Sequence, residues 1–275
     1  MGIADTAEDE TQGDDAPAHV STPMISRLNT AARVALGSVS DLALPPLCVG
    51  CGTRLVAHTT LCAACWRGID FIRPPLCDRL GIPLPYDTGG VMVSAAAVAD
   101  PPDFERARAV ARYSGLMRDL VHDLKFRDKH DARRLFGRWL VEAGGELVAG
   151  ADVIVPVPLA WRRLVWRRFN QSQILAKEVS RLSGKPLAPL ALYRTRATRS
   201  QVGLSRAERK RNVAGAFSVT PGQAAKIAGR AVLVIDDVVT TGATAGAAAR
   251  ALKKAGASRV DVLALCLAVD VPAVA

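Results

Sequence analysis

The chain has 275 residues, of which 49% are hydrophobic, and its 36 Lys and Arg exceed its 26 Asp and Glu to give a net charge of +10. This composition excludes a generally disordered chain and leaves room for domains of about 100 to 200 residues. The sequence has neither an apolar run of about 20 residues nor a secretory signal, so we expect a cytoplasmic protein without membrane insertion.

The N-terminal segment is expected to fall into two parts. Residues 1–22 are acidic and polar, with six Asp and Glu and no Lys or Arg in the first 20, which predicts a disordered tail. Residues 23–44 carry apolar side chains about every 3.6 residues, which predicts an amphipathic helix that docks elsewhere on the protein. Pro45 and Pro46 then end this helix.

Residues 45–81 contain two pairs of cysteines, and two residues separate the members of each pair. Four thiolates at this spacing can surround one tetrahedral Zn²⁺, and so short a segment needs a metal for its folding free energy, on the order of 10 kcal/mol. We therefore predict a small four-cysteine zinc ribbon with a structural Zn²⁺. A redox dithiol, inert thiols and an iron–sulfur cluster remain alternatives. The predicted ligands are Cys48, Cys51, Cys62 and Cys65.

Residues 82–90 are rich in Pro and Gly and predict a linker to a large domain, residues 91–275. In that domain, apolar β-branched runs alternate with helical patterns, which predicts an α/β fold with a Rossmann-like parallel sheet covered on both faces. No internal repeat is evident. Strands are expected at 107–113, 151–157, 216–219, 231–235 and 259–269, helices at 115–126, 131–147, 170–182 and 243–255, and a long basic loop after residue 193.

The strongest motif lies where the strand at 231–235 ends. Asp236 and Asp237 follow it directly, and the small and hydroxyl residues from Thr240 to Thr244 open the next helix. Ligands of open α/β sheets bind outside the carboxyl ends of the strands, and such a helix start offers backbone N–H groups to a phosphate. Two carboxylates beside it suit ribose hydroxyls, with a metal ion nearby. The Lys of a Walker loop and the glycines of a dinucleotide motif are missing, and the alternative is an ordinary helix start capped by Thr.

Residues 160–215 hold 14 Lys and Arg against two acids, Glu178 and Glu208. The positive electrostatic field of these residues attracts phosphate-rich ligands but does not distinguish small phosphates from nucleic acid. The alternative is that the basic residues form a solvated surface without a ligand. Four of the arginines lie around aromatic residues, so they could follow a DNA backbone while the rings stack on bases, at about 1 to 3 kcal/mol per base. Alternatively, the rings are core residues and their neighbours contact pyrophosphate. These residues are Arg162, Arg163, Arg167 and Arg168, with Trp161, Trp166 and Phe169.

These motifs together resemble a known family. The segment from Val232 to Thr244 is similar to the 5-phosphoribosyl-1-pyrophosphate (PRPP) motif of type I phosphoribosyltransferases. From about residue 45 to 270, the chain resembles the ComF competence family, in which a Cys-rich ribbon precedes such a domain. Arg168 departs from the family pattern, which more often has Gly there. The supporting segments are Pro156 to Leu159, Arg167 to Ser172, Arg194 to Gln201, Gly203-Leu204, Arg209, Asn212-Val213, Gly215 to Phe217 and Leu120 to Phe126.

The resemblance implies a role for each matching segment. Asp236 and Asp237 would be the catalytic carboxylates that hold the ribose hydroxyls, and Mg²⁺ would accompany PRPP. The 5′-phosphate loop would be Val238, Val239, Thr240, Thr241, Gly242, Ala243 and Thr244, and the pyrophosphate loop Val155, Pro156, Val157 and Pro158. The residues of a closing loop or a DNA contact would be Arg162, Arg163, Arg167, Arg168, Asn170, Gln171, Arg194, Gln201 and Arg209.

The family often has a second Cys-x-x-Cys-Gly turn, whereas this chain reads Cys77-Asp78-Arg79-Leu80-Gly81. Leu80 takes the place of a ligand, so a complete second ribbon is not expected, and whether Cys77 binds a metal stays open. His58 is a weak substitute ligand. Cys266 lies in an apolar strand and is expected in the core.

Three functions stay open. The first is an enzyme that transfers phosphoribose from PRPP, which mainly needs to hold the leaving group, orient the acceptor and exclude water. The second, implied by the ComF resemblance, is a competence factor that handles single-stranded DNA during uptake, with proteins of the competence machinery as partners. The third is a PRPP-sensing regulator without turnover. The sequence identifies neither the acceptor nor the oligomeric state.

Overall fold

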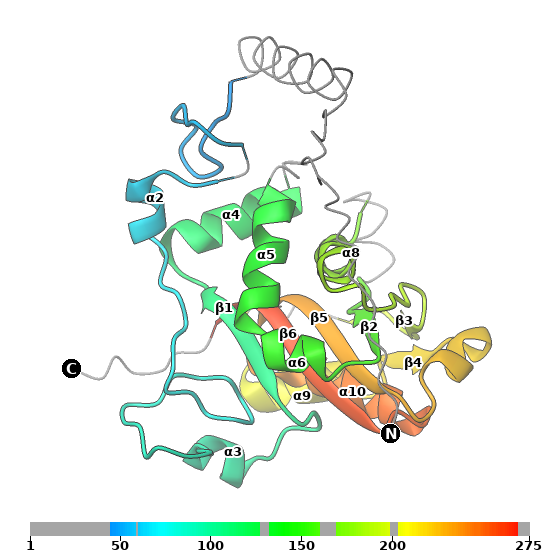
Figure 1. Cartoon of the computed structure of the whole chain (residues 1–275). Coiled ribbons are helices and arrows are strands. Elements are labelled where there is room, and N and C mark those ends of the chain that lie inside the picture. Colours follow the sequence, from blue (N-terminus) through cyan, green and yellow to red (C-terminus); the bar gives the residue numbers. More distant parts are fainter. Residues whose placement is uncertain (1–44, 59, 127–131, 160–168, 199–202, 269–275) are drawn as a thin grey trace, which may run out of the picture. The chain divides into compact units, whose positions relative to one another are not determined.

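The computed structural model describes residues 45–58, 60–126, 132–159, 169–198 and 203–268. The chain from Pro46 onward forms one compact unit (Figure 1). Several predictions lie outside the described residues, namely the acidic tail (1–22), the amphipathic helix (23–44), Arg162, Arg163, Arg167, Arg168 and Gln201. Within the part that is described, no helix has the length and hydrophobicity needed to cross a bilayer.

A parallel sheet lies at the centre of this unit. In spatial order, its strands are β1 (Ala107–Arg112), β6 (Arg259–Leu267), β5 (Ala231–Val239) and β2 (Val153–Pro156). The middle strands, β5 and β6, carry apolar side chains that are buried on both faces, as expected for a parallel sheet covered by helices. Val232 and Val234 pack into one hydrophobic cluster and Leu233 and Ile235 into the other, following the two-residue period of a strand.

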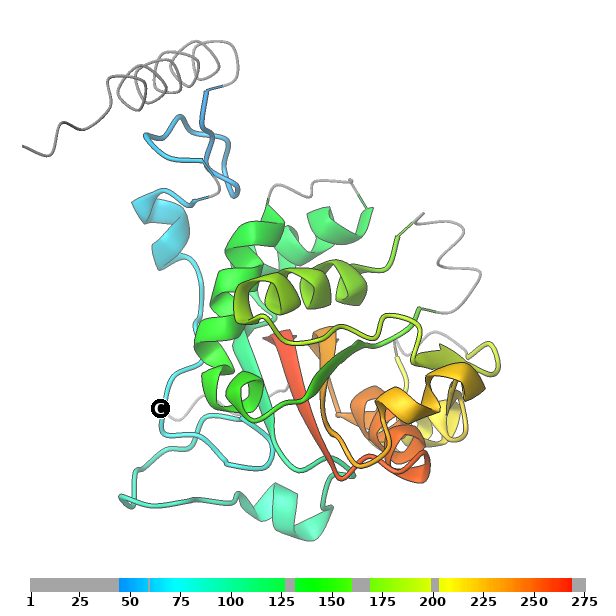
Figure 2. The same cartoon turned by 45° about the vertical axis from the view of Figure 1, so that its right-hand side comes forward.

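Helices cover both faces of the sheet (Figure 2). One face carries α4 (Gly115–Phe126), α5 (Arg133–Ala143), α6 (Gly145–Ala149) and α8 (Gln171–Ser183). The other face carries α10 (Ala243–Lys254) and the antiparallel pair of β3 (Leu192–Arg194) and β4 (Phe217–Val219). The helix α9 (Arg206–Val213) contacts α10, and a 3-10 helix, η2 (Pro221–Lys226), precedes β5. The predicted α/β fold with a covered parallel sheet is confirmed.

Three predicted elements differ from the structure. The helix expected at 131–147 is interrupted at Gly144, where only glycine fits, since a Cβ would lie 2.6 Å from a methyl group of Leu263 in β6. The long basic loop contains α9, which begins with a capping box between Ser205 and Glu208. The strand expected at 231–235 continues to Val239, so both aspartates of the motif belong to β5 and not to the loop after it.

The ribbon contains a short helix, α2 (Ala63–Arg67), and a second short helix, α3 (Ala95–Ala99), follows further along the chain. The Trp66 ring lies 4.8 Å from that of Phe71 and 5.8 Å from that of Trp139 in α5, measured between centroids. Such tilted and edge-on aromatic pairs stabilise an interface beyond the area that they bury. The ribbon is therefore attached to α5 by an aromatic cluster.

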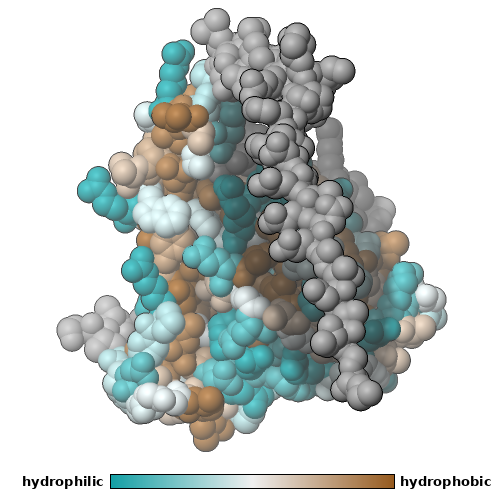
Figure 3. Space-filling model, viewed as in Figure 1, coloured by the Kyte–Doolittle hydropathy of each residue, from teal (hydrophilic) through white to brown (hydrophobic). Residues whose placement is uncertain are grey.

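In the space-filling view, apolar residues reach the surface beside hydrophilic ones (Figure 3).

Candidate functional site

Two carboxylates lie near the carboxyl end of β5. The Asp236 side chain is nearly buried, with 7% exposure, and Asp237 is half-buried. The Ser172 hydroxyl donates a hydrogen bond to Asp236 Oδ1 (3.1 Å), and the backbone N–H of Asp237 donates to the same oxygen (2.9 Å). Hydrogen bonds to a carboxylate are strong and fix its direction. Ser172, to which the sequence motif assigned no role of its own, therefore positions Asp236.

The loop after β5 leads directly into α10. Gly242 is the N-cap of α10 and has a φ of 75°, a left-handed conformation that favours glycine, and no side chain caps the helix. The first N–H groups of a helix have no partner within it, and the helix dipole adds partial positive charge, so this end can hold an anion. Thr241 supports this interpretation, because its Oγ1 atom is buried without a hydrogen-bond partner among the described residues. A ligand oxygen at this loop would satisfy that hydroxyl.

The loop after β2 lies beside the carboxyl end of β5. The Val157 N–H donates to the Ile235 carbonyl (2.9 Å), which extends the pairing of the two strands. Asn170, the N-cap of α8, donates from Nδ2 to the Val157 carbonyl (3.0 Å) and accepts from the Ser172 N–H (3.1 Å). The predicted pyrophosphate loop and Asp236 are thus connected through the first residues of α8.

Two of the arginines predicted for a closing loop or a DNA contact, Arg194 and Arg209, lie within the described residues. Arg194 Nε donates to the Pro158 carbonyl (3.0 Å), and its guanidinium carbon lies 4.7 Å from the centre of the Phe217 ring. Arg209, on α9, borders a cavity of about 230 Å³ together with residues 240–242 of the predicted phosphate loop. Arg194, at the end of β3, thus fixes the predicted pyrophosphate loop, and Arg209 lies beside the start of α10. Gln171, also predicted for this set, is buried in the first turn of α8.

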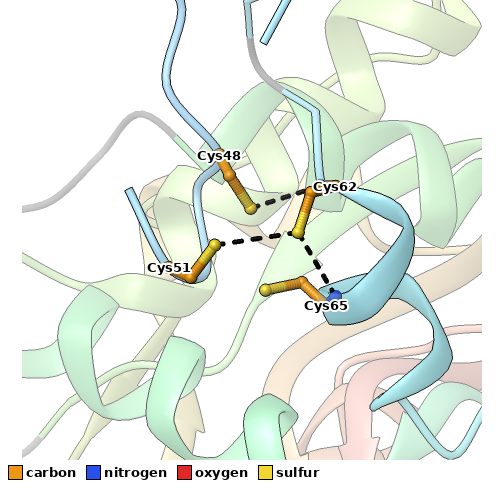
Figure 4. A group of neighbouring side chains, drawn as sticks. All are labelled: Cys48, Cys51, Cys62 and Cys65. Carbon is orange, nitrogen blue, oxygen red and sulfur yellow. Dashed lines mark hydrogen bonds between the residues drawn. The ribbon is translucent and has the colours of Figure 1, made fainter. Parts of the chain in front are cut away.

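Four cysteines form a separate cluster in the ribbon (Figure 4). The sulfur atoms of Cys48, Cys51, Cys62 and Cys65 all lie within 4.8 Å of one another, and those of Cys51 and Cys62 are 3.7 Å apart. Zn–S bonds of about 2.3 Å in a tetrahedron place two sulfurs about 3.8 Å apart. The cluster therefore has the dimensions and the soft donors of a structural zinc site.

The thiols of this cluster differ in acidity. Hydrogen bonds with Thr53 lower the pKa of Cys51 to about 6, whereas burial raises the pKa of Cys65. A bound divalent cation deprotonates the thiols that coordinate it. Zn²⁺ would thus bring all four cysteines to the thiolate form that completes the site.

The first cysteine pair lies in a tight turn. The Cys48 N–H donates to the Thr53 carbonyl (2.7 Å), and the Gly52 N–H donates to the Cys48 carbonyl (2.9 Å). Gly52 has a positive φ of 74°. The Cys62 N–H donates to Cys48 Sγ (3.2 Å), and Cys62 is the N-cap of α2. This turn and the start of α2 together present the four sulfurs to one point.

Residues 76–99 repeat these contacts. The Cys77 N–H donates to the Ile82 carbonyl (2.8 Å), and the Gly81 N–H donates to the Cys77 carbonyl (2.8 Å). Gly81 again has a positive φ, of 64°. The Ser94 N–H donates to Cys77 Sγ (3.2 Å), and Ser94 is the N-cap of α3. The chain therefore contains an internal repeat, contrary to our expectation, and we call residues 76–99 the metal-free repeat.

In the metal-free repeat, the positions of the four ligands are taken by Cys77, Leu80, Ser94 and Ala97. Cys77 and Ala97 are buried and Leu80 is half-buried, so apolar contacts replace the metal. Among the described residues, one group of cysteines has the geometry of a metal site, and Cys77 is not part of it. Residues 82–90, which we expected to be a linker, join the two halves of this repeat.

Relatives match most of the chain. It is 34% identical over 235 residues to the DNA utilization protein YhgH of Escherichia coli, which covers 82% of this chain and 98% of that protein. It is 28% identical to competence protein F of Haemophilus influenzae, covering 80% and 96%, and 28% identical to competence protein ComFC of Bacillus subtilis, covering 54% and 58%. The chain belongs to the ComF competence family.

Two domain families match separate parts of this ComF-family chain. The double zinc ribbon domain matches residues 39–97, which include both the zinc ribbon and the metal-free repeat. The phosphoribosyl transferase domain matches residues 174–273, which include β5, the loop after it and α10. The predicted fold, a phosphoribosyltransferase-type α/β domain behind a four-cysteine zinc ribbon, is confirmed, and the ribbon is a double one of which the first half has a complete ligand set.

Proposed function

We propose that this ComF-family protein binds PRPP at the carboxyl end of β5 and transfers its phosphoribosyl group to an acceptor. The observation that carries the proposal is the Thr241 hydroxyl, which is buried and has no partner in the described part of the chain. It lies in a loop that joins a strand with two terminal acids to the start of α10. The 5′-phosphate would accept hydrogen bonds from this hydroxyl and from the first N–H groups of α10. Asp236 and Asp237 would accept hydrogen bonds from the ribose 2′ and 3′ hydroxyls.

The transfer requires the protein to stabilise the developing charge and to orient the reacting groups. The protein does not need to supply a nucleophile. Positive charge builds up on the sugar while the bond from C1′ to the pyrophosphate oxygen breaks and the acceptor approaches. Residues 155–158 would hold the leaving pyrophosphate, because Asn170 and Arg194 fix this loop by hydrogen bonds to its carbonyls. Mg²⁺ bound with PRPP would neutralise part of the negative charge of the leaving group.

Calorimetric titration of PRPP in the presence of Mg²⁺ tests this assignment. In the double variant Asp236→Asn, Asp237→Asn, we expect PRPP affinity to fall by more than about 100-fold, since each hydrogen bond to a charged group contributes about 1.5 to 3 kcal/mol. Asp119→Asn is a matched control, because Asp119 is exposed on α4. Unchanged affinity in the double variant would falsify the site.

The relatives are named for DNA utilization and competence. We therefore propose that the phosphoribosyl site serves a protein that takes part in the uptake or use of DNA. Fold does not choose between turnover and sensing, so product formation from PRPP must be measured beside binding. A protein that binds PRPP and never releases pyrophosphate would act as a sensor.

Binding of single-stranded DNA without turnover is a second candidate function, favoured by one aromatic surface. Trp66 is 46% exposed and borders a cavity of about 290 Å³ together with Arg73 and Trp139. A base stacked on such a ring gains about 1 to 3 kcal/mol, and arginine attracts the phosphates. We expect oligothymidylate to bind less tightly as salt rises and to bind weakly to Trp66→Ala. Equal binding by Trp66→Ala and by Tyr86→Ala, which alters another exposed aromatic residue, would contradict this function.

A further inference from the structure

The metal-free repeat borders the predicted phosphate loop. Between them lies the cavity of about 230 Å³, with residues 240–242 on one side. The repeat contributes Leu80, Ile82 and Ala96 to the other side. Leu80 occupies the position that corresponds to Cys51 in the zinc ribbon, so the side chain that replaces a metal ligand forms a wall of this cavity.

The walls of the cavity are mostly apolar. Phe104 and Leu267 add to the apolar side chains of the repeat. The described lining contains no Asp, Glu, Asn or Gln side chain, the groups that pair with the polar edge of a nucleobase. Its polar side chains are Arg209 and the two threonines of the phosphate loop, and Thr241 Oγ1 is the buried hydroxyl that has no partner among the described residues.

The size of the cavity limits what it can hold. An apolar protein cavity of about 150 Å³ binds benzene. The present cavity of about 230 Å³ thus accommodates one substituted ring. Apolar side chains and the one guanidinium of the described lining suit an aromatic ring that carries an acid group.

We propose that this cavity binds the acceptor of the phosphoribosyl group, and that the acceptor is a planar aromatic acid. The ring would contact Leu80 and Phe104, and the acid group would pair with Arg209. In the transfer, a nitrogen of the acceptor forms the bond to C1′, the C1′–O bond breaks, and its electron pair leaves with pyrophosphate. The proton of the attacking N–H passes to water. This inference rests on the proposed transfer of phosphoribose.

Benzoate is a direct probe, because it has the ring and the acid group but no nitrogen that could react. Its binding to the full-length, zinc-bound protein can be followed by NMR titration, with benzamide and adenine as comparisons. We expect benzoate to bind at least about fivefold more tightly than either comparison compound, because only benzoate pairs with the guanidinium. Equal affinities, or tighter binding of adenine, would overturn the proposal.

Two pairs of variants locate the probe. Ala96→Trp places a large ring at the wall of the cavity and should weaken benzoate binding by at least about tenfold. Ala95→Trp alters the neighbouring residue of α3, which is exposed like Ala96 but does not line the cavity, and should leave benzoate binding unchanged. Arg209→Gln should remove the preference for benzoate over benzamide, whereas Arg211→Gln, at an exposed position of α9, should keep it. Unchanged benzoate binding in Ala96→Trp would overturn the location.

Titration of PRPP against the same variants separates this inference from the proposed function. Retained PRPP affinity in Ala96→Trp supports an acceptor cavity that lies beside the PRPP site and shares the phosphate loop with it. Loss of both ligands in Ala96→Trp would place the cavity within the PRPP site and overturn the acceptor assignment. If the unaltered protein binds benzoate at this cavity but does not bind PRPP, the proposed function fails and the aromatic-acid site stands.

Discussion

Thr241 has a hydroxyl that is buried without a hydrogen-bond partner among the described residues. Such a group destabilises a folded protein by about 1 to 3 kcal/mol, because it loses its bond to water on folding. We expect Thr241→Val, which keeps the side-chain shape, to leave the free energy of unfolding unchanged or raise it. The same change should weaken PRPP binding by about tenfold, because the 5′-phosphate loses a donor. Urea unfolding and PRPP titration measure the two effects.

Thr220→Val is the matched control. The Thr220 hydroxyl donates to the Leu190 carbonyl (2.8 Å), so its removal should cost about 1 kcal/mol of stability and leave PRPP affinity unchanged. If Thr241→Val loses stability as Thr220→Val does and still binds PRPP normally, the Thr241 hydroxyl does not face the ligand.

Ser172 acts on the site through Asp236. We expect Ser172→Ala to lower PRPP affinity by about tenfold, because the carboxylate loses the hydroxyl that fixes its direction. Ser172→Thr keeps the hydroxyl and should restore most of the affinity. Calorimetry measures both, and circular dichroism checks that the fold is intact. The positioning role is excluded if the alanine and threonine variants bind PRPP equally.

Site residues that are neighbours in the chain could be predicted from the sequence better than site residues that folding brings together. Asp236, Asp237 and the threonines after them form one continuous motif, so their place at a strand end could be predicted. Ser172 lies 64 positions before Asp236, and only the packing of α8 beside β5 brings the two together. The place of Arg209 likewise depends on α9.

The elements of the domain were largely predictable, since buried strands and amphipathic helices alternate with clear periods. The start of α9 could also have been predicted, because Ser205 and Glu208 have the spacing of a capping box. Of the metal-free repeat, only the turn from Cys77 to Gly81 could be matched in the sequence, because three of the four ligand positions are changed. Its length differs as well: Cys48 and Cys62 are 14 positions apart, whereas Cys77 and Ser94 are 17 apart.

The repeat predicts that a second metal site can be restored. In the triple variant Leu80→Cys, Ser94→Cys, Ala97→Cys, the new thiols join Cys77 in the geometry of the zinc ribbon, so we expect one additional Zn²⁺ per chain. Native mass spectrometry counts the bound metal. Adding Cys77→Ser to the triple variant should remove the gain. A metal content equal to that of the unaltered protein would show that the four positions do not converge.

For the molecule as a whole, the zinc ribbon and the PRPP site should be separable. The metal stabilises the ribbon, whereas the proposed PRPP site lies at the carboxyl end of β5. We expect a zinc-selective chelator, or Cys48→Ser, to change tryptophan fluorescence, because Trp66 loses its fixed contact with Trp139. PRPP affinity should stay within about twofold, given that each tenfold corresponds to about 1.4 kcal/mol. Loss of PRPP binding together with zinc would show that the two sites are coupled.

The net charge of the chain overstates the number of cationic side chains that can bind a polyanion, because some of them make contacts within the fold. Arg108 forms ion pairs with Asp78 and Glu146, and Arg196 donates to the carbonyls of Asn212 and Ala214. These arginines hold segments of the fold together. The composition could predict attraction to phosphates but not which cations are committed to internal contacts, because that depends on distant parts of the chain.

The incomplete ligand set of the second half of the double ribbon has a cellular consequence. Its turn is held by backbone hydrogen bonds of Cys77 and Gly81, and Cys77 and Ala97 are buried, so we expect this half to fold without a metal ion. A cell starved of zinc would lose order in the segment around Cys48 while the wall beside the phosphate loop stayed in place. Zinc starvation would then affect the contacts of the zinc ribbon before it affects ligand binding at the proposed PRPP site.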